Sequence, residues 1–142
     1  ICLSKGLGAP VGSVLTGTVD FITEARRWRK VVGGGMRQSG LLAAAGIHAL
    51  EHHVERLADD HAHALRLAEG LVEIEGCQVD PDQVQTNMVY ARFPEIAVES
   101  IVNSLRKRRI LVYPGNPLRL VTHLDVSAED VDRAVEVIAE VL

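Results

Sequence analysis

The chain has 142 residues, of which 47% are hydrophobic and 24% charged, and its formal net charge is −4. This mixture is typical of a folded globular protein and excludes collagen-like and disordered chains. The negative charge argues against a polyphosphate partner held by bulk electrostatics. Apolar runs fall far short of the roughly 20 residues that a membrane helix needs. Two cysteines are too few for a disulfide framework, which predicts a reducing, cytoplasmic location.

The first residue is Ile1 rather than methionine, and residues 1–4 have the pattern of a strand already under way. No basic stretch followed by an apolar one is present, so no secretory signal is predicted. We therefore expect the chain to be part of a longer functional unit.

Residues 1–19 alternate short apolar stretches with glycines, which predicts two short buried strands joined by a tight turn. Asp20 is the expected N-cap of a helix over residues 21–32. Three consecutive glycines, residues 33–35, then interrupt the helix.

One long helix is predicted from Met36 to about Glu75, because apolar side chains recur there at steps of three and four. The predicted stripe consists of Leu50, Val54, Leu57, His61, Leu65, Ala68 and Leu71. Its first part, residues 40–46, is rich in Gly and Ala and suits close packing against other backbone. The change in composition along the helix indicates that it bridges two packing environments.

The rest of the chain predicts a small α+β domain with helices on one face. Strands are expected at residues 86–93, 110–113 and 118–122, and helices at residues 96–108 and from Ser127 to Leu142. Ser127 with Asp130 resembles a capping box at the start of the last helix. In the strand at 118–122, alternation places Leu118, Leu120 and Thr122 on one face and Arg119 on the other.

Lys5 is the first candidate for chemistry, because it ends an apolar run and is followed at once by Gly6-Leu7-Gly8. A lysine amine is a nucleophile only when neutral, and burial among apolar groups favours that state. The glycines would leave room for a flat ligand beside the amine. From spacing alone, a surface lysine at the end of a strand is the favoured interpretation.

Three segments together resemble the pyridoxal-phosphate-dependent threonine aldolases, which have the aspartate-aminotransferase fold type. They are Leu3-Ser4-Lys5-Gly6-Leu7-Gly8-Ala9-Pro10-Val11-Gly12-Ser13, Arg26–Lys30 followed by Gly33–Gly40, and Leu118-Arg119-Leu120-Val121-Thr122-His123-Leu124-Asp125. These segments occur in the family's order and span nearly the whole chain.

The resemblance implies a role for four residues. Lys5 would bond covalently to the cofactor pyridoxal 5'-phosphate, and Arg119 would bind the α-carboxylate of the amino acid substrate, which suits its planar fork. Lys30 and Arg37 would lie near the cofactor, reaching its phosphate or a neighbouring subunit's site. A solvated basic face at the end of a helix remains the alternative for these two.

The resemblance also implies an α/β fold of fold type I, of which this chain is the C-terminal two-fifths. Residues 1–47 would end the large, parallel-sheet domain that binds the cofactor, and residues 48–142 would form the bridging helix and the small C-terminal α+β domain. The family's phosphate-binding loop, its ring-stacking histidine and its pyridinium-pairing aspartate would all precede Ile1.

A competing site is the sequence His48-Ala49-Leu50-Glu51-His52, which fits the H-x-x-E-H pattern of some zinc peptidases. Such a pair of histidines, one helical turn apart, can hold zinc. The helix is rich in histidine anyway and no third ligand can be identified, so no metal is predicted.

The expected function of the parent protein is retro-aldol cleavage of threonine, allo-threonine and similar β-hydroxy-α-amino acids to glycine and an aldehyde. The base that takes the β-hydroxyl proton would lie outside this chain. Two alternatives stay open, namely another amino acid lyase or a transaminase of the same fold type, and a fragment without activity. We expect a homodimer or homotetramer in the cytoplasm, without nucleic acid or membrane partners.

Overall fold

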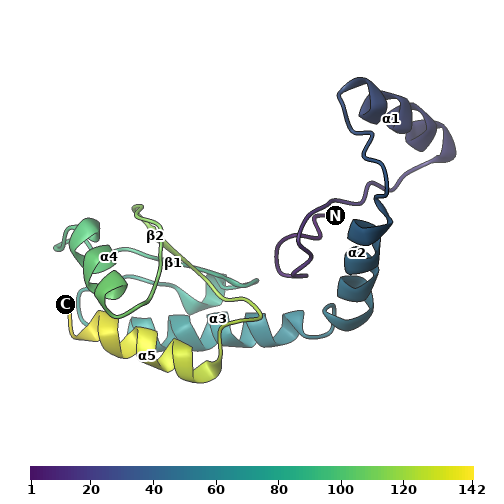
Figure 1. Ribbon diagram of the computed structural model, residues 1–142. Coiled ribbons are helices and arrows are strands. Elements are labelled where there is room, and N and C mark those ends of the chain that lie inside the picture. Colours follow the sequence, from purple (N-terminus) through teal and green to yellow (C-terminus); the bar gives the residue numbers. More distant parts are fainter. The chain divides into compact units, whose positions relative to one another are not determined.

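The computed structural model describes residues 1–142 and divides the chain into two compact units, Ile1–Glu55 and Arg56–Leu142 (Figure 1). Five α-helices, one 3-10 turn and a two-stranded sheet make up the chain, so the class is α/β. In order they are α1 (Val19–Val31), α2 (Gly40–His52), α3 (Leu57–Val72), the turn Pro81–Gln83, β1 (Met88–Ala91), α4 (Val98–Lys107), β2 (Leu118–Val121) and α5 (Ala128–Ala139). No helix is both long and apolar enough to cross a membrane.

The first unit begins with a hairpin-like loop rather than the two predicted strands. A single antiparallel bridge joins Cys2 to Ser13, and the amide of Leu3 donates to the carbonyl of Gly12 at 2.9 Å. Pairing stops there because the chain between them folds back on itself, with Ala9 donating to the carbonyl of Leu3 at 3.0 Å.

Helix α1 starts two residues before its predicted start, and its cap is not the predicted Asp20. Thr18 is the N-cap, and its hydroxyl oxygen accepts from the amide of Phe21 at 3.4 Å. Asp20 lies in the first turn, where a carboxylate also complements the helix dipole. The predicted glycine stop is confirmed: Gly33 has φ +92°, and a side chain on Gly34 would lie 2.8 Å from the backbone oxygen of Arg29.

The predicted helix from Met36 to Glu75 is wrong, because two helices occupy this stretch. α2 ends at His52, α3 begins at Leu57, and the four residues between them are not helical. No glycine or proline marks the break, and the apolar periodicity of the sequence continues across it. The sequence therefore gives no local signal that the helix ends. The predicted stripe is correct only at its end, where Ala68 and Leu71 are buried. His61 and Leu65 are exposed, whereas Asp60, Ala64 and Leu67 face the core in their place.

The second unit is built on β1 and β2, which pair antiparallel. Val89 faces Leu120 and Ala91 faces Leu118 on the buried side, while Tyr90 faces Arg119 on the exposed side. The alternation predicted for residues 118–122 is thereby confirmed. The strand predicted at 110–113 is wrong: the amide of Ile110 donates to the carbonyl of Leu105, which ties this segment to the end of α4.

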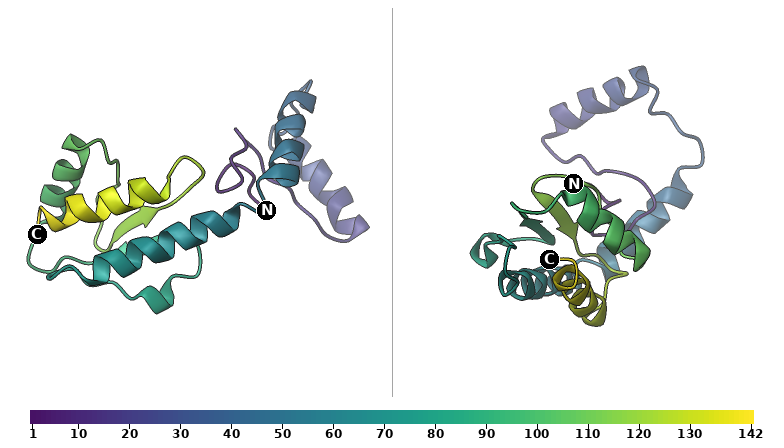
Figure 2. Two further views of the ribbon diagram at one scale, coloured as in Figure 1. Left: turned by 90° about the horizontal axis from the view of Figure 1, so that it is seen from below. Right: turned by 90° about the vertical axis from the view of Figure 1, so that its left-hand side faces the viewer.

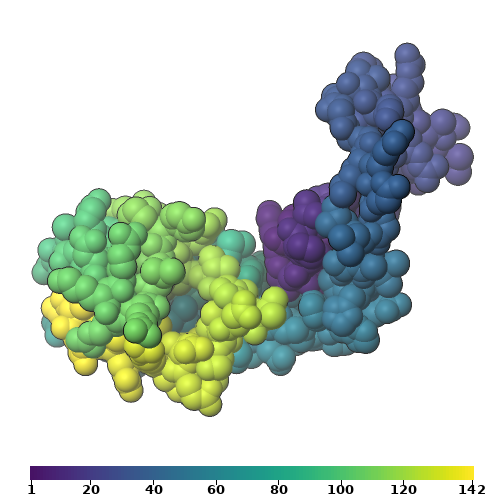
Figure 3. Space-filling view, in the orientation of Figure 1, coloured from purple at the N-terminus to yellow at the C-terminus, as the bar shows by residue number.

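Three helices of the second unit cover the buried face of the sheet. α3 packs against β1, α5 against α3, and α4 against α5, and α3 and α5 run side by side in the views of Figure 2. The second unit forms one packed body in Figure 3, and its fully buried side chains include Leu71, Ile101, Leu105, Leu118, Ile138 and Val89. The predicted helices on one face of a small sheet are confirmed.

Polar contacts hold the N-terminal part of α5. Ser127 and Asp130 form the predicted capping box, and these hydrogen bonds lower the pKa of the Asp130 carboxyl. Arg66 of α3 donates two hydrogen bonds, of 2.6 and 2.7 Å, to the carboxylate of Asp132 in α5. These hydrogen bonds lower the pKa of the Asp132 carboxyl.

Candidate active site

Lys5 opens a four-residue turn. The amide of Gly8 donates to the carbonyl of Lys5 at 2.8 Å, and Gly8 has φ +70°, a conformation that favours glycine. Contrary to the burial that the sequence suggested, the Lys5 side chain is exposed, because Leu3 and Leu7 take the buried positions of the loop. The Lys5 amine forms no ion pair or hydrogen bond within the chain.

The loop that carries Lys5 packs on one face of α2. A side chain on Gly46 would lie only 3.0 Å from a methyl carbon of Leu3, and Ala49, one turn later, is 1% exposed. At the end of the same face, Nδ1 of His53 lies 2.6 Å from the carbonyl oxygen of Leu7. The sequence predicts close packing by the small residues of 40–46, and Gly46 packs in this way against Leu3.

Lys30 and Arg37 lie elsewhere in the first unit. Lys30 is in the last turn of α1, and its ammonium nitrogen folds over Gly35, where an added Cβ would approach it to 2.5 Å. Arg37 is exposed in the segment before α2. None of the three cationic side chains, of Lys5, Lys30 and Arg37, forms a hydrogen bond or an ion pair within the chain.

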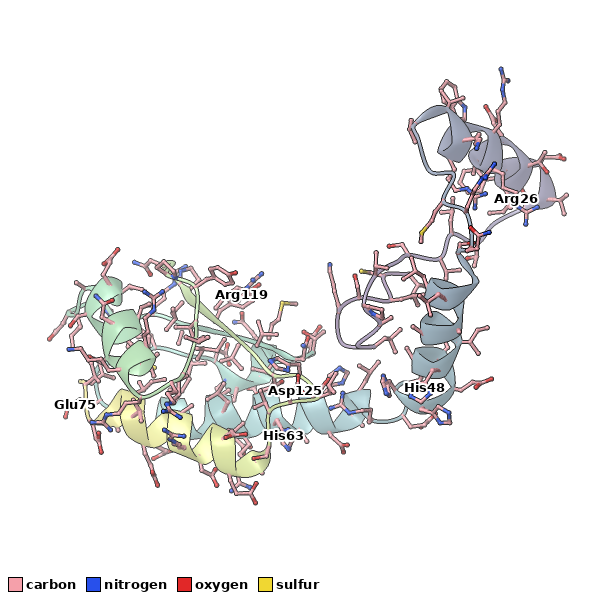
Figure 4. The ribbon with its side chains drawn as sticks, viewed as in Figure 1. Arg26, His48, His63, Glu75, Arg119 and Asp125 are labelled. Carbon is pink, nitrogen blue, oxygen red and sulfur yellow. The ribbon has the colours of Figure 1, made fainter.

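Arg119 lies in the middle of β2 in the second unit, on the exposed face of the sheet (Figure 4). Tyr90 is its partner on β1, and Tyr113 pairs with it by an isolated bridge on the other side. Its guanidinium has no acidic partner in the chain. Arg119 is therefore not part of a structural ion pair within these residues. It lines a cavity of about 500 Å³ together with Tyr113, His123 and Asp125.

Buried polar contacts hold the end of β2, and the sequence analysis did not find them. The hydroxyl of Thr122 donates to the carbonyl of Asp60 at 2.6 Å, and the side-chain amide of Asn87 donates to the carbonyl of Thr122 at 2.7 Å. Asp60 is fully buried, and its carboxylate pairs with Arg56. The spacing of Arg56 and Asp60 by four residues is the one signal that could have indicated this pair.

The alternative zinc motif does not gather a ligand set. The rings of His48 and His52 are tilted at 50° to each other with centroids 4.5 Å apart, and the ring of His53 meets His48 edge-on at 5.3 Å. No group of three or more His, Cys, Asp or Glu side chains lies close enough to hold a metal ion.

Known proteins resemble the chain in sequence over most of its length. It is 50% identical over 129 residues to the low specificity L-threonine aldolase of Escherichia coli K12, an alignment that covers 91% of this chain and 38% of that protein. It is 47% identical over 137 residues to a probable low-specificity L-threonine aldolase of Arabidopsis thaliana, covering 93% of this chain and 39% of the relative. The chain thus spans about two-fifths of the length of these relatives.

The fold is also found in a solved structure. A putative aromatic amino acid beta-eliminating lyase/threonine aldolase from Exiguobacterium sp. 255-15 matches 99% of this chain and 44% of its own, with a TM-score of 0.77 and 17% identity. Residues 1–94, which include Lys5, Lys30 and Arg37, match the family described as beta-eliminating lyase. Enzymes of this kind depend on pyridoxal phosphate. On this match, the chain belongs to the beta-eliminating lyase family.

Proposed function

We propose that this chain is the C-terminal part of a pyridoxal-phosphate-dependent aldolase that cleaves β-hydroxy-α-amino acids. Threonine would give glycine and acetaldehyde, and allo-threonine the same products. The observation that carries the proposal is the 50% identity to a low specificity L-threonine aldolase over 129 residues. The free amine of Lys5 and the free guanidinium of Arg119 support it, because both are side chains that this chemistry needs unpaired.

The proposal assigns the two parts of the chain to different domains. Residues 1–47 would complete the large parallel-sheet domain of fold type I, and residues 48–142 would hold the bridging segment and the small C-terminal domain. The compact second unit, Arg56–Leu142, supports an independent small domain.

Lys5 fits the role of the residue that holds the cofactor. Its amine is exposed, it has no competing partner, and the glycine at position 8 keeps one side of the turn free of side-chain atoms. When bound, pyridoxal phosphate supplies an electron sink for the charge left on Cα as the Cα–Cβ bond breaks. Lys30 and Arg37, both cationic and unpaired, suit the phosphate group.

Arg119 would bind the substrate's α-carboxylate through two parallel N–H groups. Its backbone is held from both sides by Tyr90 and Tyr113, which fixes the point on the sheet from which the side chain extends. Fixing the carboxylate determines which bond of Cα can break, and orientation of this kind can lower the barrier by several kcal/mol. The proton of the β-hydroxyl would pass to a base in the rest of the protein.

The complete protein would be a homodimer or homotetramer of the cytoplasm, with a small amino acid as its ligand. Cys2 and Cys77 are both free thiols, which suits a reducing compartment. Large apolar side chains of the first unit, such as Val19, Val32 and Leu41, are 79–82% exposed, and patches of this kind are typical of surfaces between subunits.

The test is a product assay of the complete protein with threonine and added pyridoxal phosphate. Glycine and acetaldehyde in equal amounts, together with the visible absorbance of bound cofactor, are the expected result. A keto acid in place of glycine would assign the protein to the other amino acid lyases or the transaminases. Absence of both products and of cofactor absorbance would contradict an enzymatic role.

A further inference from the structure

The contact between His53, the C-cap of α2, and Leu7 joins residues 46 positions apart. It is the one side-chain hydrogen bond between the end of this helix and the Lys5 loop. A carbonyl oxygen can only accept, so at 2.6 Å the Nδ1 atom must carry the proton. That condition is met by the neutral ring with its proton on Nδ1 and also by the charged ring. The other ring nitrogen, Nε2, is not needed for this contact.

The acceptor of this hydrogen bond lies inside the turn that carries Lys5. Leu7 is the third residue of the turn, and the hydrogen bond from Gly8 to the carbonyl of Lys5 closes it. Leu7 is 8% exposed and its hydrogen bond to His53 is half-buried, so water would replace a lost donor there only in part. His53 therefore ties the turn at a point two residues after Lys5.

Gly46, Ala49 and His53 are spaced by three and four residues, which puts all three on one face of α2 and its C-cap. The first two receive the apolar side chains of the loop, and the third supplies the polar contact. Apolar packing alone fixes how close the loop lies to the helix but not its rotation, because it has no direction. A hydrogen bond is directional and can fix that rotation.

We propose that His53 is a positioning residue, which holds the Lys5–Gly8 turn through the carbonyl of Leu7 and so sets the direction of the Lys5 amine toward the cofactor. The inference rests on the proposed function for its catalytic consequence. Its structural part, an ordered turn in the protein without cofactor, can be tested separately.

Three substitutions separate the donor from the bulk of the side chain. In His53→Asn the amide nitrogen is attached at Cγ, as Nδ1 is in histidine, so the donor keeps its place. In His53→Gln the donor is one carbon further away, and His53→Leu has similar bulk without any donor. His52→Ala is the matched control, since His52 is the exposed neighbour and its ring pairs with His48 rather than with the Lys5 loop.

The first readout is hydrogen exchange of the amides of Gly8 and Ala9 in the complete protein without cofactor. We expect exchange about ten-fold faster in His53→Leu and His53→Gln, as for the loss of one hydrogen bond, and unchanged in His53→Asn and His52→Ala. The second readout is threonine cleavage. Loss of the donor should lower kcat by about 10- to 100-fold, as for a small misplacement of a reacting group, and leave KM unchanged.

Equal exchange in His53→Leu and the wild type would overturn the proposal, and so would a His53→Asn variant that behaves like His53→Leu. If His53→Leu does not fold, the comparison of Asn with Gln decides the question in the same way. A wild type that forms no glycine would overturn the proposed function alone, because the exchange pattern does not depend on turnover.

Discussion

The two units of the chain differ in how they bury their apolar side chains. In Arg56–Leu142, Leu71, Ile101, Leu105 and Leu118 are completely buried in one core. In Ile1–Glu55, no residue of α1 is buried, and the buried set is confined to the Lys5 loop and the face of α2 beneath it. The second unit thus has a continuous core of its own, whereas the packing of the first is limited mainly to the loop that carries Lys5.

The two units also carry different candidate functional groups on different kinds of support. The first unit offers an exposed amine, Lys5, on a turn fixed by backbone hydrogen bonds and His53. The second unit offers an exposed guanidinium, Arg119, on a strand backed by a packed core. We expect changes in the first to abolish chemistry without unfolding the second, and core changes in the second to cost stability.

The largest effect is expected from Lys5→Ala in the complete protein. Removing the amine should lower turnover of threonine by roughly 10³-fold or more, as when a covalent nucleophile is removed. The melting temperature should stay within a few degrees, because Lys5 is exposed. Lys107→Ala, an exposed lysine of the second unit, is the control. Wild-type turnover by Lys5→Ala would end the assignment.

The next effect concerns the core of the second unit. Residues 56–142 expressed alone should unfold cooperatively, and Leu71→Ala should lower the free energy of unfolding by about 2–5 kcal/mol, as for a buried leucine. Leu65→Ala on the same helix, where the side chain is 41% exposed, should lower it by less than about 1 kcal/mol. Urea titration measures both. A cooperative transition of residues 1–55 alone would contradict the contrast between the units.

A change at Arg119 tests the binding role of the second unit. Arg119→Lys keeps the charge but loses the planar fork, so carboxylate binding should weaken by about 2–3 kcal/mol. This corresponds to a rise in KM for threonine of about 30- to 160-fold. Covalent attachment of cofactor at Lys5, trapped by borohydride and located by mass spectrometry, should be unaffected. Arg106→Lys on α4 is the control, and an unchanged KM in Arg119→Lys would remove this residue from the site.

The smallest effect compares the two thiols, one in each unit. Hydrogen bonding with Ser4 lowers the pKa of Cys2, whereas burial raises the pKa of Cys77 to about 11. Only the thiolate reacts, so at pH 8 Cys77 should be alkylated by iodoacetamide about 100-fold more slowly than a free cysteine. Its rate should rise about ten-fold per pH unit below its pKa. Mass spectrometry of the 142-residue chain follows each site, and equal rates in the folded protein would refute the difference in environment.

Several features followed from the sequence because they depend on neighbouring residues. The alternation of Leu118 to Thr122, the capping box at Ser127 and the stop at Gly33 are local, and the structure has all three. The family was also evident from three segments, since the residues of a reactive site are restricted by chemistry as well as by fold. The roles of Lys5, Lys30, Arg37 and Arg119 remain predictions.

Tertiary structure alone decided the other features, because they join residues far apart in the chain. The break between α2 and α3 has no glycine or proline, and only the structure shows that residues 53–56 leave the helix. The exposure of Lys5 depends on which loop residues pack against Gly46 and Ala49. The burial of Asp60 and the hydrogen bond from His53 to Leu7 require contacts across 62 and 46 positions. The periodicity of the sequence indicates which side chains share a face of a helix or strand. Only packing against distant parts of the chain determines whether that face is buried or exposed.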